Sequence, residues 1–168
     1  MYPPGPVTEV DASALSALNN RFVAEGLTLP RSEEWVLAHI DDFRVIRDEN
    51  GHILGSVCLD DYSPSLVELV SLAVEPSAQG KGLGSALIGA AVALARRRDY
   101  PEIFAVSFSD TLFQQCGFSF GDINRYPEKH ARYARTSPDE WTVGQKHCFV
   151  LRLAEGRSRT PASGSKKQ

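Results

Sequence analysis

Apolar residues recur at helical spacing in the first part of the chain and in one longer segment at its middle. Leu15, Leu18 and Phe22 follow Asp11, whose side chain can cap a helix, and predict a helix that ends near Gly26. Further helices are predicted to begin at Ser32, Leu83 and Thr111.

Elsewhere the spacing of apolar residues changes to that of β-strands. Alternation over 43–48, a turn at 49–51 and a second run over 52–61 predict a β-hairpin. Further strands are expected at 65–74, 103–108 and 146–153. Because a helix joins 65–74 to 103–108, these two strands should be parallel. The order of elements predicts an α/β fold with a mixed central sheet flanked by helices, in a single domain.

Composition sets the domain limits and the class of protein. Residues 1–6 are rich in proline and predict a flexible tail, 155–168 predict a disordered tail, and 7–154 form the folded domain. The net charge of −3 and the absence of a long apolar run argue against nucleic acid or a membrane as the main partner. Three widely spaced cysteines and the lack of a signal peptide favour a reduced, cytoplasmic protein.

The segment LAVEPSAQGKGLGSALI places three glycines between a predicted strand and a predicted helix. Unpaired N–H groups at a helix N-terminus form a site for phosphate. A Walker loop is excluded, because Glu75 stands where the first glycine should be and Gly82 follows Lys81. A dinucleotide-binding fingerprint is disfavoured because the loop lies in mid-chain and does not directly follow its strand. A glycine-rich turn without a ligand is the other alternative.

This segment resembles the acetyl-coenzyme A signature of the GNAT superfamily of N-acetyltransferases, and the order of elements resembles that fold over 7–153. The resemblance implies that backbone amides over 79–85 bind the pyrophosphate of acetyl-CoA, while strand residues before the loop pair with its pantetheine arm. The cofactor-binding residues implied are Leu72, Ala73, Val74, Gln79, Gly80, Lys81, Gly82, Leu83, Gly84, Ser85 and Phe113.

Three later segments, AVSFSDTLFQQCGF, RYPEKHARY and GQKHCFVLRL, resemble the acetyltransferase domain of bacterial N-acetylglutamate synthases, including their short stand-alone forms. The resemblance implies L-glutamate as the acceptor. It implies substrate-binding roles for Arg31, Lys129, Lys146 and Cys148. Lys146 and Cys148 stand where that family tends to have Arg and Ser, and Tyr126 stands in place of Leu, so carboxylate specificity could be looser. Dimers are common in the superfamily, which allows a homodimer.

The reaction needs a base, because an ammonium cannot attack a thioester. Glu68, flanked by Val67 and Leu69, is the candidate, since desolvation should raise its pKa and it matches the Glu of the synthases. The alternative is a strand carboxylate satisfied by a neighbouring Arg or Lys. Ser71 matches a position close to the thioester.

Two further groups complete the expected chemistry. Many GNAT enzymes have a Tyr acid where this chain has Phe113, so Ser107 or Ser109 is the candidate proton donor. The oxyanion is expected to meet a backbone N–H at Leu72 or Val74, if the strand bulges as it does in this fold.

The sequence therefore predicts an acetyl-CoA-dependent N-acetyltransferase that acts on a small-molecule amine. No metal is expected, because the four histidines show no ligand spacing. The alternatives are a GNAT enzyme for another amino acid, a polyamine or an antibiotic, and a non-catalytic sensor that binds acyl-CoA.

Overall fold

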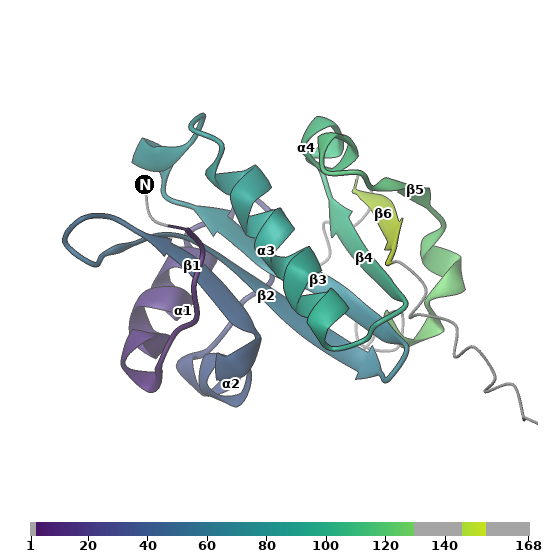
Figure 1. The fold of residues 1–168 in the computed structure, drawn as a ribbon. Coiled ribbons are helices and arrows are strands. Elements are labelled where there is room, and N and C mark those ends of the chain that lie inside the picture. The colour runs from purple at the N-terminus through teal and green to yellow at the C-terminus, as the bar shows by residue number, and fades with distance from the viewer. Residues whose placement is uncertain (1–2, 130–145, 154–168) are drawn as a thin grey trace, which may run out of the picture.

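The computed structural model describes residues 3–129 and 146–153 (Figure 1). Their helices are α1 (Ala12–Asn20), α2 (Glu33–Ala38), α3 (Leu83–Arg97) and α4 (Asp110–Gln115). Their strands are β1 (Phe43–Arg47), β2 (Ile53–Ser63), β3 (Leu66–Val74), β4 (Glu102–Ser107), β5 (Ser119–Gly121) and β6 (His147–Arg152). Short 3-10 turns lie at Glu9–Asp11, Ile40–Asp42, Pro76–Ala78 and Ile123–Arg125.

The strands form one mixed sheet in the order β1-β2-β3-β4-β6-β5. The predicted hairpin is confirmed as the antiparallel pair β1–β2, whose connecting turn contains Gly51 at φ +85°. The predicted parallel pair is confirmed as β3–β4, while β6 runs antiparallel to β4. The sequence analysis missed β5, a three-residue strand on the edge of the sheet.

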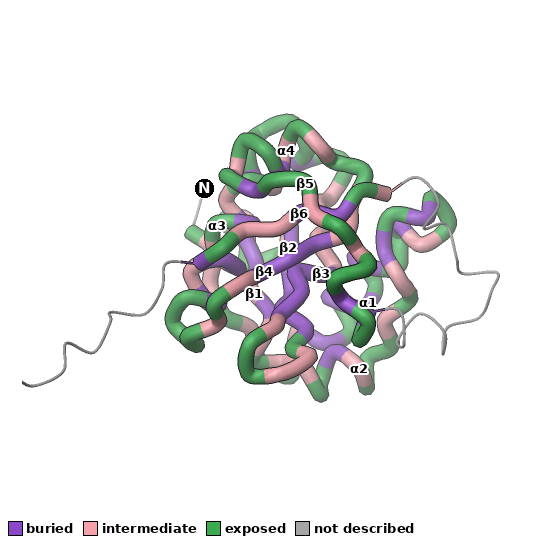
Figure 2. The backbone as a smooth tube through the Cα atoms, turned by 90° about the vertical axis from the view of Figure 1, so that its right-hand side faces the viewer, coloured by how far each residue is buried: buried purple, intermediate pink, exposed green. Residues whose placement is uncertain are grey.

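Two layers of helix cover the sheet (Figure 1). Helix α3 packs on one face, where its buried residues join those of β2, β3 and β4 in the main core. Helices α1 and α2 cover the other face near β1 and β2, over a second cluster that includes Leu15, Val36 and Phe43. The central strands are consequently the most buried part of the chain (Figure 2). This burial on both faces explains why β3 is apolar nearly throughout.

The predicted start of α2 is confirmed, whereas the predicted end of α1 is wrong. Ser32 begins α2 as expected, and its Oγ accepts a hydrogen bond from the Trp35 N–H at 3.1 Å. Helix α1 ends at Asn20 and not near Gly26, because the residues between them form turns. The predicted flexible tail over 1–6 is partly attached, since Gly5 exchanges two 2.9 Å backbone hydrogen bonds with Val45. The predicted tail over 155–168 lies outside the described residues.

Candidate functional site

Strands β3 and β4 separate along their length. They pair only at Val67 with Ile103 and at Glu68 with Phe104. Beyond Glu68 the edge of β3 has no register with β4, so backbone N–H and C=O groups of β3 face the opening between the two strands. Such an opening can accept an extended chain that hydrogen-bonds to the edge of β3.

A β-bulge lies in β3 at the start of this opening. Ser56 pairs with Ala73 and Cys58 pairs with Val70, so two residues of β3 oppose one residue of β2. One of the two is Ser71, which has φ +53°, a value that non-glycine residues rarely adopt. The bulge that the resemblance led us to expect is therefore present. The bulge interrupts the β2–β3 ladder at Ser71 and Leu72, and a backbone N–H left out of a ladder can serve as a hydrogen-bond donor to a ligand.

A groove of about 450 Å³ continues from the bulge to the N-terminus of α3. All of the predicted cofactor-binding residues except Lys81 and Phe113 line it. The others that line it are Phe22, Leu27, Ala78, Ser109 and Leu112. The walls are mostly apolar, whereas the end at the helix is formed by glycine-rich backbone.

The glycine loop exposes backbone N–H groups at the start of α3. Gly82 is the N-cap at φ +83°, and Gly80 has φ +76°, so both need the freedom of glycine. The first bond within the helix runs from the Ala86 N–H to the Gly82 carbonyl at 3.2 Å. The N–H groups of the first helical turn therefore have no partner within the helix, and with the helix dipole they favour an anion such as phosphate.

Two predicted contacts fall elsewhere than expected. Phe113 lies in the core between Phe118 and Phe149 and is 1% exposed, so it does not reach the groove; Leu112 on the same helix does. The Oγ of Ser107 accepts a hydrogen bond from the Ser109 N–H at 3.0 Å, and Ser109 is the serine that lines the groove.

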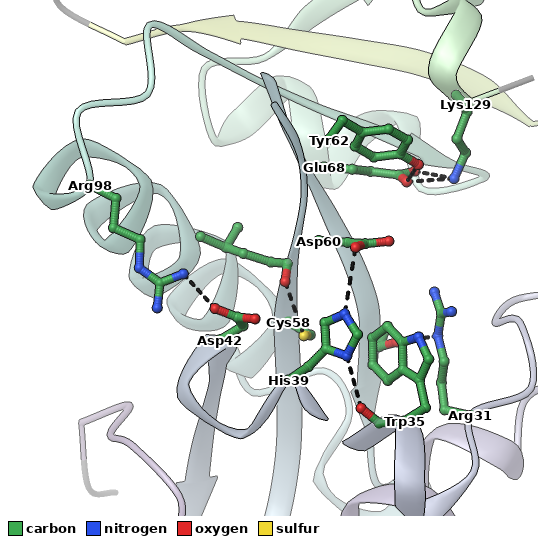
Figure 3. A network of polar contacts seen from close by, with 12 residues as sticks. Arg31, Trp35, His39, Asp42, Cys58, Asp60, Tyr62, Glu68, Arg98 and Lys129 are labelled. Carbon is green, nitrogen blue, oxygen red and sulfur yellow. Dashed lines mark hydrogen bonds and ion pairs between the residues drawn. The ribbon is translucent and has the colours of Figure 1, made fainter. Parts of the chain in front are cut away.

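Glu68 lies on the face of the sheet opposite α3, 2% exposed (Figure 3). Its Oε1 accepts hydrogen bonds from the Tyr62 hydroxyl at 2.7 Å and from the Lys129 Nζ at 2.6 Å. Lys129 also contacts Oε2, which makes a buried ion pair. The structure thus brings two predicted site residues together: Glu68 is buried as expected, and its carboxylate is paired with a neighbouring lysine, as in the alternative that the sequence left open.

A second buried carboxylate lies next to Glu68. Asp60 of β2 stands directly opposite Glu68 in the register, and residues so paired lie on the same face of the sheet. His39 approaches Asp60 with its Nε2 at 3.7 Å from Oδ1, and this contact with the Asp60 carboxylate raises the pKa of His39 above its usual value. Figure 3 shows Asp60 between the Glu68 group and His39.

Arg31 lies on this face beside the bulge. Its Nε donates to the Ser71 Oγ at 3.3 Å, and its guanidinium stacks 4.0 Å from the centre of the Trp35 ring. Within the described ranges its two η nitrogens have no hydrogen-bond or ion-pair partner. The result is a positioned cation with its two outer donors available, next to the strand residue that begins the groove.

Lys146 and Cys148 come from the β6 side. Burial, together with the positive charge of Lys129, lowers the pKa of Lys146, whose Nζ lies 5.3 Å from the centre of the Phe108 ring. Cys148 is buried beside Phe104 and Tyr126, and burial raises the pKa of its thiol to about 11. Cys148 is therefore a core thiol, whereas Lys146 is a half-buried cation.

Sequence reasoning missed four residues of this face: Trp35, His39, Asp60 and Tyr62. Helix spacing was a weak signal for the row of Arg31, Trp35 and His39, because only Trp35 lies within α2, whereas Arg31 precedes the helix and His39 caps its end. The pairing of Asp60 with Glu68 was not readable, because it depends on the register between two strands.

Within residues 3–129 and 146–153, no group of three His, Cys, Asp or Glu side chains is placed to hold a metal ion. In the same ranges no helix has the length and apolar character to span a bilayer.

Comparisons with known proteins agree with this geometry. The sequence pattern of the Acetyltransferase (GNAT) family matches residues 14–118. An uncharacterised N-acetyltransferase of Chlorobaculum tepidum is 30% identical over 128 residues, which cover 76% of this chain and 82% of that protein.

Two solved structures share the fold. A Mycobacterium tuberculosis protein in complex with CoA superposes with a TM-score of 0.78 at 19% identity, covering 90% of this chain and 99% of that one. The N-acetylglutamate synthase of Neisseria gonorrhoeae, complexed with coenzyme A and N-acetyl-glutamate, gives 0.76 at 26% identity. That match covers 89% of this chain but only 34% of the synthase, so this chain spans about a third of its length.

Proposed function

This chain belongs to the GNAT acetyltransferase family and is an acetyl-CoA-dependent N-acetyltransferase, and we propose that its acceptor is the α-amine of an amino acid, with L-glutamate the leading candidate. The observation that carries this proposal is the Arg31 guanidinium, held by Ser71 and Trp35 with its η nitrogens available. Guanidinium donors match the two oxygens of a carboxylate. The likeness to the gonococcal N-acetylglutamate synthase supports the same acceptor.

We further propose that the groove takes the acetyl-CoA molecule. The first turn of α3, from Leu83 to Ser85, would hold the pyrophosphate through backbone N–H groups, and the edge of β3 from Leu72 to Val74 would hydrogen-bond the pantetheine arm. Lys81 is exposed and does not line the groove, so its charge would act only at a distance. The thioester would then lie near the bulge, between the groove and Arg31.

The proposed reaction is a direct attack. The acceptor ammonium gives a proton to Glu68, directly or through one water, and its nitrogen forms a bond to the thioester carbonyl carbon. The C–S bond then breaks, and CoA leaves as a thiolate, which needs little help from an acid because thiol pKa values are about 8.5. The second proton lost by the acceptor nitrogen passes, directly or through water, to this thiolate, so the products are the N-acetylated acceptor and CoA. A backbone N–H of β3, at Leu72 in the bulge or at Val74 just beyond it, would stabilise the oxyanion.

The contacts of Glu68 leave room for this role. An ionised carboxylate has about four lone-pair sites, and Tyr62 and Lys129 use three of them. The remaining site, on Oε2, can accept a hydrogen bond from the acceptor or from a water. Lys129 neutralises the charge of Glu68. We therefore assign Lys129 mainly as the partner of Glu68, and only secondarily as a cation for the acceptor carboxylate. Lys146, which has no hydrogen bond or ion pair with an acidic side chain among the described residues and feels Glu68 only at a distance, is the second proposed cation for the acceptor.

The test is a thiol-release assay with acetyl-CoA and a panel of amino acids, polyamines and aminoglycosides, with calorimetric measurement of CoA binding on the same sample. Turnover of glutamate above all other acceptors is the expected result. Turnover of a polyamine or an aminoglycoside without any amino acid would contradict the proposed acceptor. Tight CoA binding with no turnover of any panel compound would also contradict the proposed acceptor. The acceptor would then be a compound outside the panel.

A further inference from the structure

Trp35 lies between two cationic or ionisable side chains in a three-residue stack. The Arg31 guanidinium carbon is 4.0 Å from the centre of the Trp35 ring, and the His39 ring lies 3.8 Å from it at an interplanar angle of 14°. Trp35 belongs to α2, Arg31 lies just before its N-cap Ser32 and His39 is its C-cap, so the two ring contacts, and not the helix alone, place the three side chains in one row. Figure 3 shows Trp35 between the other two side chains.

Both ends of this stack are attached to the sheet. At one end His39 contacts Asp60 of β2 across 3.7 Å, and its Nδ1 also lies 2.8 Å from the Trp35 carbonyl oxygen. At the other end the Nε of Arg31 donates to Ser71 in the bulge of β3. The edge of the Trp35 ring also meets Phe43 of β1 at 6.2 Å between centroids. The indole therefore has little freedom to turn, and the guanidinium stacked on it is restrained with it.

We propose that Trp35 is a positioning residue for the acceptor: with His39 as its support, it holds the Arg31 guanidinium at a fixed place beside the bulge, ready for the acceptor carboxylate. This inference rests on the proposed carboxylate-bearing acceptor and adds to it the residues that orient the cation. A long arginine side chain loses rotamer freedom when it binds a ligand. If Arg31 is already held in place, this entropy is not lost when the acceptor binds. Trp35 therefore raises the affinity for the acceptor and leaves the affinity for acetyl-CoA unchanged.

The first test compares Trp35→Leu with Trp35→Phe, which keeps an aromatic face. A cation–π contact is worth from about twofold to about thirtyfold in binding. We expect Trp35→Leu to raise the KM for glutamate by about tenfold, while Trp35→Phe stays within about threefold of the unaltered enzyme. The affinity for CoA, measured by calorimetry, should be the same in all three proteins.

A double variant separates positioning from a general loss of packing. If Trp35 acts through Arg31, then Trp35→Leu should add nothing to the KM of an Arg31→Ala enzyme, because residues that act together are not additive. The NMR signal of the Arg31 side-chain Nε–H gives a measurement that needs no acceptor. Its heteronuclear NOE should be high in the unaltered protein and in Trp35→Phe, and low in Trp35→Leu.

The outcomes distinguish the two proposals. Turnover of glutamate with the same KM in Trp35→Leu, or an Arg31 signal that stays rigid in that variant, overturns the positioning role and leaves the proposed function intact. No turnover of any carboxylate-bearing acceptor by the unaltered enzyme contradicts the proposed function and, with it, this role of Trp35.

Discussion

The Nε of Arg31 donates a hydrogen bond to the Oγ of Ser71 at 3.3 Å, across 40 positions of the chain. Ser71 has φ +53° in the bulge of β3, and its neighbour Leu72 is the first residue of that strand to line the groove. The cation proposed for the acceptor is therefore attached to the strand proposed for acetyl-CoA. If both proposals hold, this contact would fix the acceptor carboxylate relative to acetyl-CoA.

Removing the charge of Arg31 should weaken acceptor binding selectively. A hydrogen bond to a charged group contributes about 1.5–3 kcal/mol, so Arg31→Leu should raise the KM for glutamate by about 10- to 100-fold. The affinity for CoA should not change. Arg96→Leu is the matched control, because Arg96 is an exposed cation at the far end of α3. Equal KM values for the Arg31 variant and the control would exclude Arg31 from the acceptor site.

Replacing Glu68 should separate catalysis from cofactor binding. General-base catalysis contributes about 10²- to 10⁴-fold, so Glu68→Gln should lower kcat by that range while the calorimetric affinity for CoA stays the same. The change also breaks a buried ion pair with Lys129, which costs about 3–5 kcal/mol of stability.

The double variant Glu68→Gln with Lys129→Met is the control for that loss of stability. It removes both charges of the pair, so denaturant unfolding should show stability restored relative to the single variant. Its turnover should stay low, because the base is still missing. Recovery of turnover in the double variant would mean that Glu68 is a structural carboxylate and not the base.

A side chain at position 82 should weaken the affinity for CoA. An L-residue at φ +83° is disfavoured by about 1–2 kcal/mol, and the strain falls on the backbone that presents the N–H groups. Gly82→Ala should therefore raise the Kd for CoA severalfold. Gly89→Ala on the exposed side of the same helix is the control, and it should stabilise the protein by up to about 1 kcal/mol with no effect on CoA. An unchanged Kd in Gly82→Ala would count against phosphate binding at this loop.

The contact between His39 and Asp60 should make stability depend on pH. The Asp60 carboxylate, followed by the Trp35 carbonyl and with a smaller contribution from Asp42, raises the pKa of His39 above its usual value of 6.5. A raised folded-state pKa stabilises the protein fully below about pH 6.5, and the contribution is lost as pH rises through the folded-state value. Urea unfolding should show that His39→Gln is more destabilising at pH 6 than at pH 9. The difference should become smaller in an Asp60→Asn background, where the Trp35 carbonyl and Asp42 remain. An equal cost of His39→Gln at both pH values in the unaltered background would contradict this linkage.

The elements that the sequence predicts best are those with a clear period. Helix α3 and the hairpin strands β1 and β2 were found because apolar residues recur at 3.6 or at 2, whereas β3 and β4 were found as short, nearly continuous apolar runs. Strand β5 was missed because Ser119–Gly121 is too short to show any alternation. The end of α1 was placed too late, because the turns after Asn20 continue up to Gly26, which has φ +70°.

The site was predictable where one local segment forms it and unpredictable where distant segments meet. The glycine loop is local, so its residues could be read directly. The contact of Glu68 with Lys129 spans 61 positions, and only the folded chain shows that these two candidates are partners. Phe113 was assigned to the cofactor because it takes the place of a family tyrosine, but its side chain belongs to the core.

The most direct test of the carboxylate acceptor compares two nearly identical substrates. L-glutamate and isoglutamine differ only in that the second has an α-carboxamide in place of the α-carboxylate. Initial rates of CoA thiol release should give a kcat/KM for isoglutamine about 100-fold or more below that for glutamate, because a site built for a charged group rejects an analogue that lacks it. Equal kcat/KM values for the two would show that the enzyme does not bind the α-carboxylate, and would contradict the role given to Arg31.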